Sequence, residues 1–407
     1  MDTVLAVLIA CLFGLPHFLV LAYYAGCRLI LNAEQSNHRV DHVASNGRPT
    51  GPPGENLMLF VIIPTYNEEA TISTKLDSIL RADYPLDRID VVVVDGNSAD
   101  QTVALAKRFA QEHPELSMVV IQQELRFGKS NAVQEALKLL HGDVAVITDA
   151  DSVFLPGTLR AVADRISQPE VGAVTGLQGL RHENRPADRM EVEYSRFYST
   201  LRLAESAIDS TPIFRGEVTA VRADIIRKIE YGKFAPLADD SDLAVQVRLL
   251  NWRSVVEPSA GFVELAPPTL WSRFKQKRRR GSGLIRLLSR TLPAVMGLER
   301  STAYKLVFIA NLLMVIAAPT TLGPFIIVAA YLTIAALGTW GFVILWALFA
   351  LSVIGLYAMR SPMASLIVGY LHSQVALLAA IPGAFSKRTT WSQIEEVRVR
   401  WQKTYGR

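Results

Sequence analysis

The sequence has few of the side chains that build disulfide frameworks and metal clusters. Only two cysteines, Cys11 and Cys27, occur among its 407 residues, and both lie in or beside the first apolar segment. This excludes a disulfide framework and a cysteine-based metal cluster. The seven histidines are scattered without ligand spacing, so a zinc site is not expected. No internal repeat or low-complexity tract is evident.

Charged side chains are missing from two long stretches. Residues 3–26 contain no Asp, Glu, Lys or Arg and match the ~20 residues that cross a bilayer core. No basic segment precedes this run, and it is long for a signal peptide, so we favour a retained membrane helix. Between Lys305 and Lys387 the only charge is Arg360, while Gly and Pro interrupt the apolar run. These breaks predict about four spanning helices, near 304–320, 322–337, 340–359 and 363–384.

The net charge of +4 is not gathered on one face. Basic clusters lie at 273–280 and 387–407, beside the apolar segments, whereas a nucleic-acid-binding protein needs a concentrated basic surface. Positive flanks mark the cytoplasmic side of a membrane. We therefore expect an integral protein of the cell (plasma) membrane whose soluble part is cytoplasmic. Membrane lipids are expected partners, nucleic acid is not, and the oligomeric state stays open.

Apolar runs and amphipathic segments alternate between the two membrane regions. Strands are predicted at 57–64, 89–94, 118–122 and 144–148, and helices at 69–82, 100–112 and 130–140. This order predicts a Rossmann-like α/β domain, with a mostly parallel sheet and helices on both faces. Ligands bind such sheets at the carboxyl ends of the strands.

The fourth predicted strand ends in Asp149-Ala150-Asp151. Two carboxylates at a strand tip suit a divalent metal, and a metal there can neutralise a diphosphate. A solvated turn is the alternative interpretation. The first strand ends in Pro64-Thr-Tyr-Asn-Glu68 and the second in Asp95, followed by Ser98 or Asp100 as a helix cap.

Polar groups at these strand ends also suit a nucleotide. The Asp95 carboxylate could accept a nucleobase N–H, and the neighbouring Tyr66 ring could offer it a flat surface. Gly128-Lys129 precedes the third helix, where an ammonium group and free backbone amides suit a phosphate. The Gly-x-x-x-x-Gly-Lys pattern of a P-loop is absent.

The order of these motifs resembles the family-2 glycosyltransferases, which have a GT-A fold. The matching patterns are Pro-x-Tyr-Asn-Glu from 64, Asp-x-x-Ser-x-Asp-x-Thr from 95, Gly-Lys-x-x-Ala from 128 and Asp-x-Asp from 149. Thr175-Gly176 is expected just after a strand, and the loop 214–217 resembles the one that frames the sugar site. The segments 237–243 and 276–280 resemble the Glu-Asp and Gln-x-x-Arg-Trp motifs of the membrane-integrated branch, which includes hyaluronan, chitin, cellulose and poly-N-acetylglucosamine synthases and ceramide glucosyltransferases.

The resemblance implies an inverting hexosyl- or N-acetylhexosaminyltransferase (EC 2.4) that uses a nucleotide-sugar donor, with UDP favoured over GDP by family habit. It assigns Asp240 as the catalytic base, Asp151 and Asp149 as ligands of Mg²⁺ or Mn²⁺, and Asp239, Gln276, Arg279 and Arg280 to the diphosphate and acceptor. The implied nucleotide-binding residues are Pro64, Tyr66, Glu68, Asp95, Lys129 and Asp149.

Three positions depart from the family pattern. Gly96 stands where the family often has a second Asp, so base recognition depends on Asp95 alone. Asp239-Asp240 replaces the Glu-Asp pair, and Arg280 replaces the Trp of the Gln-x-x-Arg-Trp motif. In polysaccharide synthases that Trp faces the acceptor sugar, so its loss puts processive polymerisation in doubt.

Several alternatives stay open at this point. The acceptor is a growing glycan, or else a lipid such as polyprenyl phosphate or a ceramide-like molecule. Asp239-Asp240 also suits a helix N-terminus, and the basic run at 278–280 suits lipid headgroups. A transporter, or a non-catalytic nucleotide-binding membrane protein, is the alternative of another class. Residues 306–359 contain no Asp, Glu, Lys, Arg or His, which disfavours the transporter.

The sequence thus predicts six segments. They are a membrane helix at 1–31, a linker at 32–56, a GT-A domain at 57–268, an amphipathic interfacial segment at 269–302, about four membrane helices at 303–385 and a basic cytoplasmic tail at 386–407.

Overall fold

The structure is a computed structural model that describes residues 3–44, 56–179, 186–264, 267, 269–299 and 301–386. The strands are β1 (Leu59–Thr65), β2 (Ile89–Asp95), β3 (Ser117–Gln122), β4 (Val144–Ile147), β5 (Ser152–Phe154), β6 (Val171–Gln178), β7 (Thr219–Arg222) and β8 (Arg253–Glu264). The helices of the α/β part are α2 (Ile72–Leu80), the short η2 (Leu86–Arg88), α3 (Thr102–Glu112), α4 (Lys129–Leu137), α5 (Thr158–Ile166), α7 (Ala223–Ile226) and α8 (Asp239–Leu249). The remaining helices are α1 (Thr3–Ala44), α6 (Pro186–Ile208), α9 (Leu270–Met296), α10 (Thr302–Leu312), the π-helical turn η3 (Leu313–Ala317), α11 (Ala318–Ala358) and α12 (Pro362–Ala384).

The eight strands form one mixed sheet in the order β3-β2-β1-β4-β7-β6-β8-β5. The first four strands in this order are parallel, β7 is antiparallel to β4 and β6, and β8 is parallel to β6. This confirms the predicted α/β domain with a mostly parallel sheet. Thr175 and Gly176, expected just after a strand, instead lie within β6.

Alternate residues of the central strands supply two separate cores. Leu59, Val61 and Ile63 pack with α2, α3 and α5 on one face, whereas Phe60 and Ile62 pack with α4, α7 and α8 on the other. Both faces of β1 are therefore buried, which explains why its sequence is continuously apolar rather than alternating.

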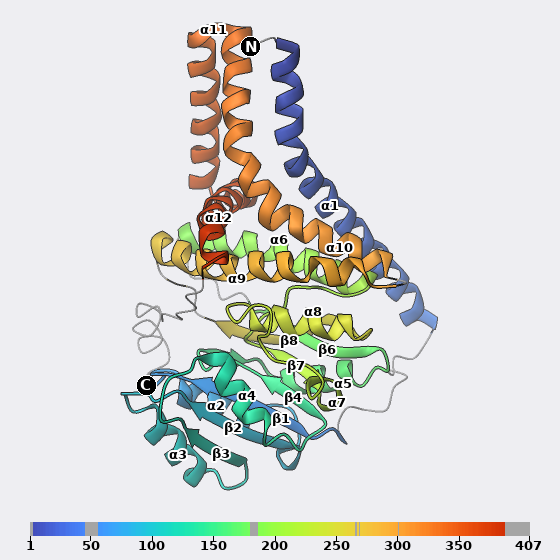
Figure 1. Cartoon of the computed structure of the whole chain (residues 1–407), viewed down its shortest axis with the longest axis vertical. Helices are drawn as coiled ribbons and strands as arrows, with labels where there is room; N and C mark the ends of the chain where they lie inside the picture. Colours follow the sequence, from blue (N-terminus) through green and yellow to red (C-terminus); the bar gives the residue numbers. More distant parts are fainter. Residues whose placement is uncertain are drawn as a thin grey trace.

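A layer formed by α6 and α9 lies between the sheet and the apolar helices (Figure 1). A buried polar network ties this layer to the apolar helices. Arg202 of α6 donates to Glu205 (2.8 Å) and to Asn311 Oδ1 of α10 (2.7 Å), and Tyr23 of α1 donates to Glu205 (2.9 Å). Because these buried hydrogen bonds join α1, α6 and α10, the network helps to fix the place of α1 and α10 over the α/β domain.

Three stretches of the described chain are long and apolar enough to cross a membrane, namely Val4–Glu34, Thr302–Ala358 and Pro362–Ala384. Within the second stretch α11 reverses direction at Gly338, whose φ of 73° lies in the left-handed region. The two halves of α11 stand side by side above the layer in Figure 1, whereas α12 lies at the level of α9. Accordingly, α12 packs mainly against α9 and α6.

Two expectations about the helices were wrong. The predicted break between 304–320 and 322–337 is absent, because the chain is helical from Thr302 through η3 into α11. Pro319 closely follows the π-helical turn, where the regular i→i−4 hydrogen-bond ladder is already interrupted, so its missing N–H does not end the helix. The helix α1 also runs on through Ala44 into the predicted linker, since 32–44 contains neither Gly nor Pro. The rest of that linker, 45–55, and the tail from 387 lie outside the described residues.

Candidate active site

The loops that follow β1, β2 and β4 meet at one edge of the sheet, because these strands are parallel neighbours. A cavity of about 420 Å³ opens there. Most of the residues that the sequence indicated line it. They are Pro64, Tyr66, Glu68, Lys129, Asp149, Asp151, Asp239, Asp240, Gln276, Arg279 and Arg280. The first turns of α4 and α8 and one face of α9 thus converge on the strand ends.

Asp95 is the exception, because it is fully buried and does not line the cavity. Its Oδ1 accepts hydrogen bonds from Thr65 Oγ1 (3.1 Å) and from Ser98 Oγ, and its Oδ2 accepts one from the Ser98 N–H (2.8 Å). Both carboxylate oxygens therefore hold the turn after β2. The helix α3 begins after Gln101, which makes no side-chain cap hydrogen bond, so neither Ser98 nor Asp100 is its N-cap; Asp100 Oδ1, one residue earlier, accepts the Thr102 N–H (3.0 Å).

Lys129 enters the cavity from the start of α4. Gly128 before it has φ 91°, a conformation that favours glycine and lets the loop turn directly into the helix. Lys129 Nζ lies 2.7 Å from Asp149 Oδ1 and 3.9 Å from Asp239 Oδ1. Burial alone would lower the pKa of Lys129, but the carboxylates of Asp149, Asp239 and Asp240 outweigh it and raise that pKa. The side chain is therefore a fixed cation among carboxylates.

Asp240 lies in the first turn of α8, where its Oδ1 accepts the Ser241 N–H (2.9 Å). Burial raises the pKa of Asp240 to about 7; Asp239 adds to the shift and Lys129 opposes it. A carboxyl group that titrates near neutral pH suits general base catalysis. The helix N-terminus expected here from the sequence is thus also the place of the predicted base.

Asp149 and Asp151 form the carboxylate pair predicted for a metal. Burial, with the charges of Asp149 and Glu217, raises the pKa of Asp151 to about 6. The described residues contain no group of three or more metal-ligating side chains. Mg²⁺ typically binds one or two carboxylates and completes its shell with phosphate oxygens. Two crowded carboxylates beside an ammonium group therefore fit a divalent ion that arrives with a diphosphate.

The side chains of Lys129, Asp149 and Asp240 all approach the backbone at Gly216. A side-chain carbon added there would lie 3.0 Å from Lys129 Nζ, 3.2 Å from Asp149 Oδ2 and 3.6 Å from Asp240 Oδ2. The loop 214–217, expected to frame the sugar site, thus touches groups from three separate elements.

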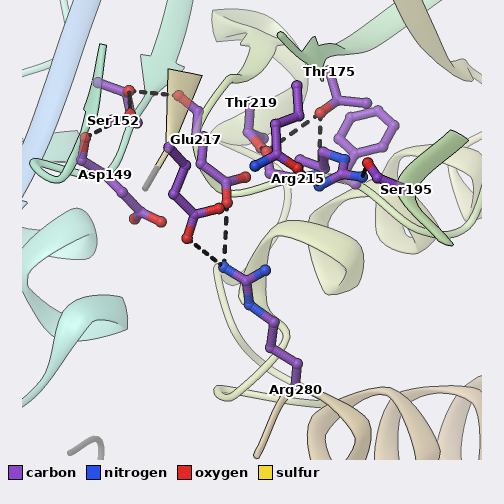
Figure 2. A network of polar contacts seen from close by, with 12 residues as sticks. Asp149, Ser152, Thr175, Ser195, Arg215, Glu217, Thr219 and Arg280 are labelled. Carbon is purple, nitrogen blue, oxygen red and sulfur yellow. Dashed lines mark hydrogen bonds and ion pairs between the residues drawn. The ribbon is translucent and has the colours of Figure 1, made fainter. Parts of the chain in front are cut away.

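Arg280 binds two buried carboxylates that the sequence did not assign. Its Nη2 lies 3.2 Å from Glu217 Oε1 and 3.2 Å from Glu264 Oε1 (Figure 2). Burial would raise the pKa of Glu217, but Arg280 and a hydrogen bond from Glu264 bring it down to about 2. Burial and the Glu217 charge raise the pKa of Glu264 well above its usual value. Arg280 therefore favours the ionised form of Glu217, whereas burial beside that charge favours the protonated form of Glu264.

Lys75 of α2 is a second group missed by the sequence. Its side chain is fully buried, and its Nζ donates to Thr148 Oγ1 (2.6 Å) and Ser152 Oγ (3.3 Å) and lies 3.5 Å from the centre of the Phe154 ring. Burial lowers the pKa of Lys75 to about 7, although nearby carboxylates oppose the shift. Thr148 and Ser152 flank the Asp-x-Asp segment, so the hydrogen bonds of Lys75 hold both ends of that segment in place.

The cavity continues from the carboxylates toward the apolar helices. Its lining there includes Tyr194 and Tyr198 of α6, Leu284 of α9, Leu377 of α12 and Val315 of η3. We call this part the membrane arm. Lys277 of α9 also lines it and lies 3.1 Å from Glu191 and 3.5 Å from the Tyr194 ring centre. The membrane arm thus mixes apolar side chains with charged ones such as Lys277, Arg202 and Glu191.

Comparison with known proteins adds to this geometry. A sequence profile of the family described as "Glycosyltransferase like family 2" matches residues 55–283. The poly-beta-1,6-N-acetyl-D-glucosamine synthase of Staphylococcus epidermidis is 22% identical over 249 residues, which are 61% of this chain and 59% of that protein. The beta-monoglucosyldiacylglycerol synthase of Synechocystis sp. is 26% identical over 197 residues, which are 47% of this chain and 40% of that protein. This chain therefore matches about three fifths or less of the length of these relatives.

A solved structure matches over nearly the whole chain. It is the mannosyltransferase PcManGT from Pyrobaculum calidifontis in complex with GDP-Man and Mn²⁺. The two structures align with a TM-score of 0.70 and 28% sequence identity, over 91% of this chain and 98% of that one.

Proposed function

Because the chain belongs to the glycosyltransferase-like family 2, we propose that it transfers a sugar from a nucleoside diphosphate donor to an acceptor presented at the membrane. Its α/β domain has the GT-A fold. The convergence of Asp149, Asp151, Lys129 and Asp240 on one cavity carries the proposal. The nucleotide-sugar complex of the similar mannosyltransferase supports it.

The transfer needs a base for the acceptor and a positive environment for the leaving group. Asp240 accepts the proton of the acceptor hydroxyl as its oxygen attacks the anomeric carbon. The bond from that carbon to the diphosphate breaks on the opposite side, so the configuration inverts. The raised pKa of Asp240 supports this role, because the group takes up a proton near neutral pH.

The diphosphate leaves with negative charge that cations must stabilise. Asp149 and Asp151 would hold a Mg²⁺ or Mn²⁺ ion, which supplies Lewis-acid stabilisation when it is bound. Lys129 exchanges its contact with Asp149 for a phosphate oxygen, and Arg279 adds a guanidinium from α9. The resemblance to the family favours UDP as the nucleotide of the donor, whereas the similar mannosyltransferase was solved in complex with GDP-Man.

The acceptor enters from the membrane arm. Leu377 and Val315 belong to apolar helices, yet they line the same cavity as Asp240. That continuity supports an acceptor whose tail stays in lipid while its hydroxyl reaches the base. Arg280, in place of the acceptor-facing Trp, supports a single transfer to a lipid or lipid-linked acceptor over processive synthesis. Glycan extension, suggested by the synthase of Staphylococcus epidermidis, is the second candidate.

The apolar helices and their basic flanks support an integral membrane protein with its catalytic domain on the cytoplasmic side. Plasma membrane residence and the helix topology belong to the same proposal. Cysteine labelling of exposed loops in intact cells and in inverted vesicles tests the orientation.

Product analysis tests the reaction itself. Membranes containing the protein are incubated with radiolabelled UDP- and GDP-sugars, with and without EDTA. We expect label in an organic-soluble glycolipid, and none when EDTA is present. Label in a large water-soluble polymer would favour glycan extension.

The Asp240→Asn variant serves as the matched control for this assay. It keeps the shape of the side chain and should bind the donor normally, but lose turnover. Weakened donor binding with normal residual turnover would refute the assigned base.

A further inference from the structure

We propose that Gln123, at the end of β3, reads the nucleobase of the donor, and that the base is guanine. The inference rests on the proposed function, because it concerns the same nucleotide. The sequence assigned base recognition to Asp95 alone. In the structure Asp95 is fully buried, lies outside the cavity lining and accepts three hydrogen bonds from Thr65 and Ser98, so another acceptor would meet the base edge.

Gln123 carries such an acceptor. The residue is 7% exposed, and its Nε2 donates to Asn131 Oδ1 (3.0 Å) and to Glu135 Oε2 (2.5 Å). Two acceptors around Nε2 fix the orientation of the amide, because an oxygen placed there would face two other oxygens. Oε1 is then left as a buried acceptor with no hydrogen-bond partner. A buried acceptor in this state is costly, and a ligand N–H would satisfy it.

Gln123 itself is not among the lining residues, but Gly96, which is, has no side chain to separate Gln123 Oε1 from the cavity. A side-chain carbon added at Gly96 would lie 3.9 Å from Gln123 Oε1 and 3.4 Å from the backbone oxygen of Thr65. Gly96, Thr65 and Tyr66 line the cavity, and Arg126 stacks on Tyr66 with its Cζ 3.8 Å from the ring centre. A base lying along the Tyr66–Arg126 stack would therefore point its edge at two acceptor oxygens.

Two donors next to these oxygens, those of Gly96 and Thr65, are already committed. The Gly96 N–H donates to the Thr65 carbonyl (2.8 Å), and Thr65 Oγ1 donates to Asp95 (3.1 Å). An edge that meets acceptors needs adjacent N–H groups. Guanine offers N1–H and the 2-amino group, whereas uracil offers one N–H between two carbonyls that would face these acceptors. The missing side chain at Gly96 also makes room for the 2-amino group.

Nucleotide binding tests the inference on the purified full chain with Mn²⁺, by isothermal titration with GDP, IDP and UDP. IDP is GDP without the 2-amino group, so the ratio of their dissociation constants isolates that contact. We expect GDP to bind at least about tenfold more tightly than IDP or UDP, since a site built around a hydrogen-bond donor rejects the analogue without it.

Two variants link this preference to the named residues. Gln123→Met removes the acceptor and should bring the GDP to IDP ratio close to one. The carbon added in Gly96→Ala makes only ordinary contacts with its neighbours, so this variant should fold normally. It should weaken the binding of GDP and leave the binding of UDP unchanged. Binding of UDP as tight as that of GDP would overturn the inference, as would a GDP to IDP ratio that neither variant changes.

Failure of the proposed function gives a different pattern. If the chain does not use a nucleotide sugar, it should bind none of the three nucleotides. Alternatively, the Asp151→Ala variant, which lacks a metal ligand, should bind them as tightly as the unmodified protein. The first of these results would overturn the inference together with the function. Metal-dependent binding without a guanine preference would overturn the inference alone.

Discussion

The proton affinity of Asp240 depends on two neighbours of opposite sign. After burial itself, Asp239 raises the pKa of Asp240 and Lys129 lowers it, with a net value of about 7. Replacing either neighbour by an uncharged residue of similar size should therefore move the pKa in a known direction. The variants are Asp239→Asn, which lowers it, and Lys129→Met, which raises it.

The geometry sets the size of the Lys129 effect. A carbon at Gly216 would lie 3.0 Å from Lys129 Nζ and 3.6 Å from Asp240 Oδ2. The two charges therefore lie within about 7 Å of each other, which corresponds to about 2 kcal/mol at an effective dielectric constant near 20. Removing the ammonium group should raise the pKa of Asp240 by about 1.5 units. Removing the carboxylate of Asp239 should lower the pKa of Asp240 by at least as much, because Asp239 influences it more strongly than Lys129 does.

The dependence of kcat/KM on pH measures these shifts. Asp240 works as a base only when it is ionised, so activity rises with pH through its pKa. The acid limb should move to lower pH in Asp239→Asn and to higher pH in Lys129→Met, whatever the absolute rates. All profiles are measured at saturating Mn²⁺, so that the metal charge acts equally on each variant.

A matched control is Asp77→Asn, which removes a half-exposed carboxylate paired with Arg81 on α2. Its profile should coincide with that of the unmodified enzyme, because solvent screens the charge. If the acid limbs of Asp239→Asn and Lys129→Met shift in the same direction, or do not shift, Asp240 is not the group that limits activity at low pH.

Three further predictions concern the metal, the sheet and stability. Asp151→Ala should abolish metal-stimulated transfer while the thermal midpoint stays near its original value; persistent metal stimulation would disprove the assignment. Gly176→Ala places a carbon 2.1 Å from the Ala260 backbone oxygen and should cost about 3 kcal/mol of unfolding free energy in denaturant titration. Gly355→Ala, with nothing within 4 Å, is its control, and an equal effect of both would contradict the clash. Burial raises the pKa of Asp242 from 3.8 to about 7, so its contribution favours folding at acid pH and is lost as pH rises from 4 to 7. Asp242→Asn should therefore raise the thermal midpoint at pH 8 and change it little at pH 5; a lower midpoint at pH 8 would contradict this.

The sheet and most of the site were predictable, because both follow from local patterns. Apolar runs on β1 and β4 indicate strands buried on both faces, and parallel strands bring their following loops to one edge. Lys129 and Asp149 could therefore be placed together although β4 lies beyond α4 in the chain. The predicted cation and carboxylate are 2.7 Å apart.

The remaining site residues could not be found in this way. Lys75 lies in an amphipathic helix, where a lysine normally faces solvent, and only the tertiary structure puts it under the Asp-x-Asp turn. Glu264 ends a strand far along the chain from Glu217, and no motif links the two. Asp95 shows the opposite difficulty: the motif suggests a ligand contact, but the folded turn after β2 buries its carboxylate completely and away from the cavity lining.

The helix breaks were misjudged because proline and glycine act differently at different positions. Pro319, just after a π-helical turn, does not end the helix, whereas Gly338 with its positive φ separates two helices. Sequence patterns alone do not distinguish these two cases.

The π-helical turn has a consequence for how the lipid environment acts on the protein. Val315 of this turn is part of the cavity wall, and it belongs to a helix that runs without interruption from Thr302 to Leu337. The tilt of such a helix adjusts to the thickness of the surrounding hydrocarbon. If this helix crosses the bilayer as proposed, acyl-chain length would act on the width of the cavity at Val315, and so on which acceptors reach Asp240.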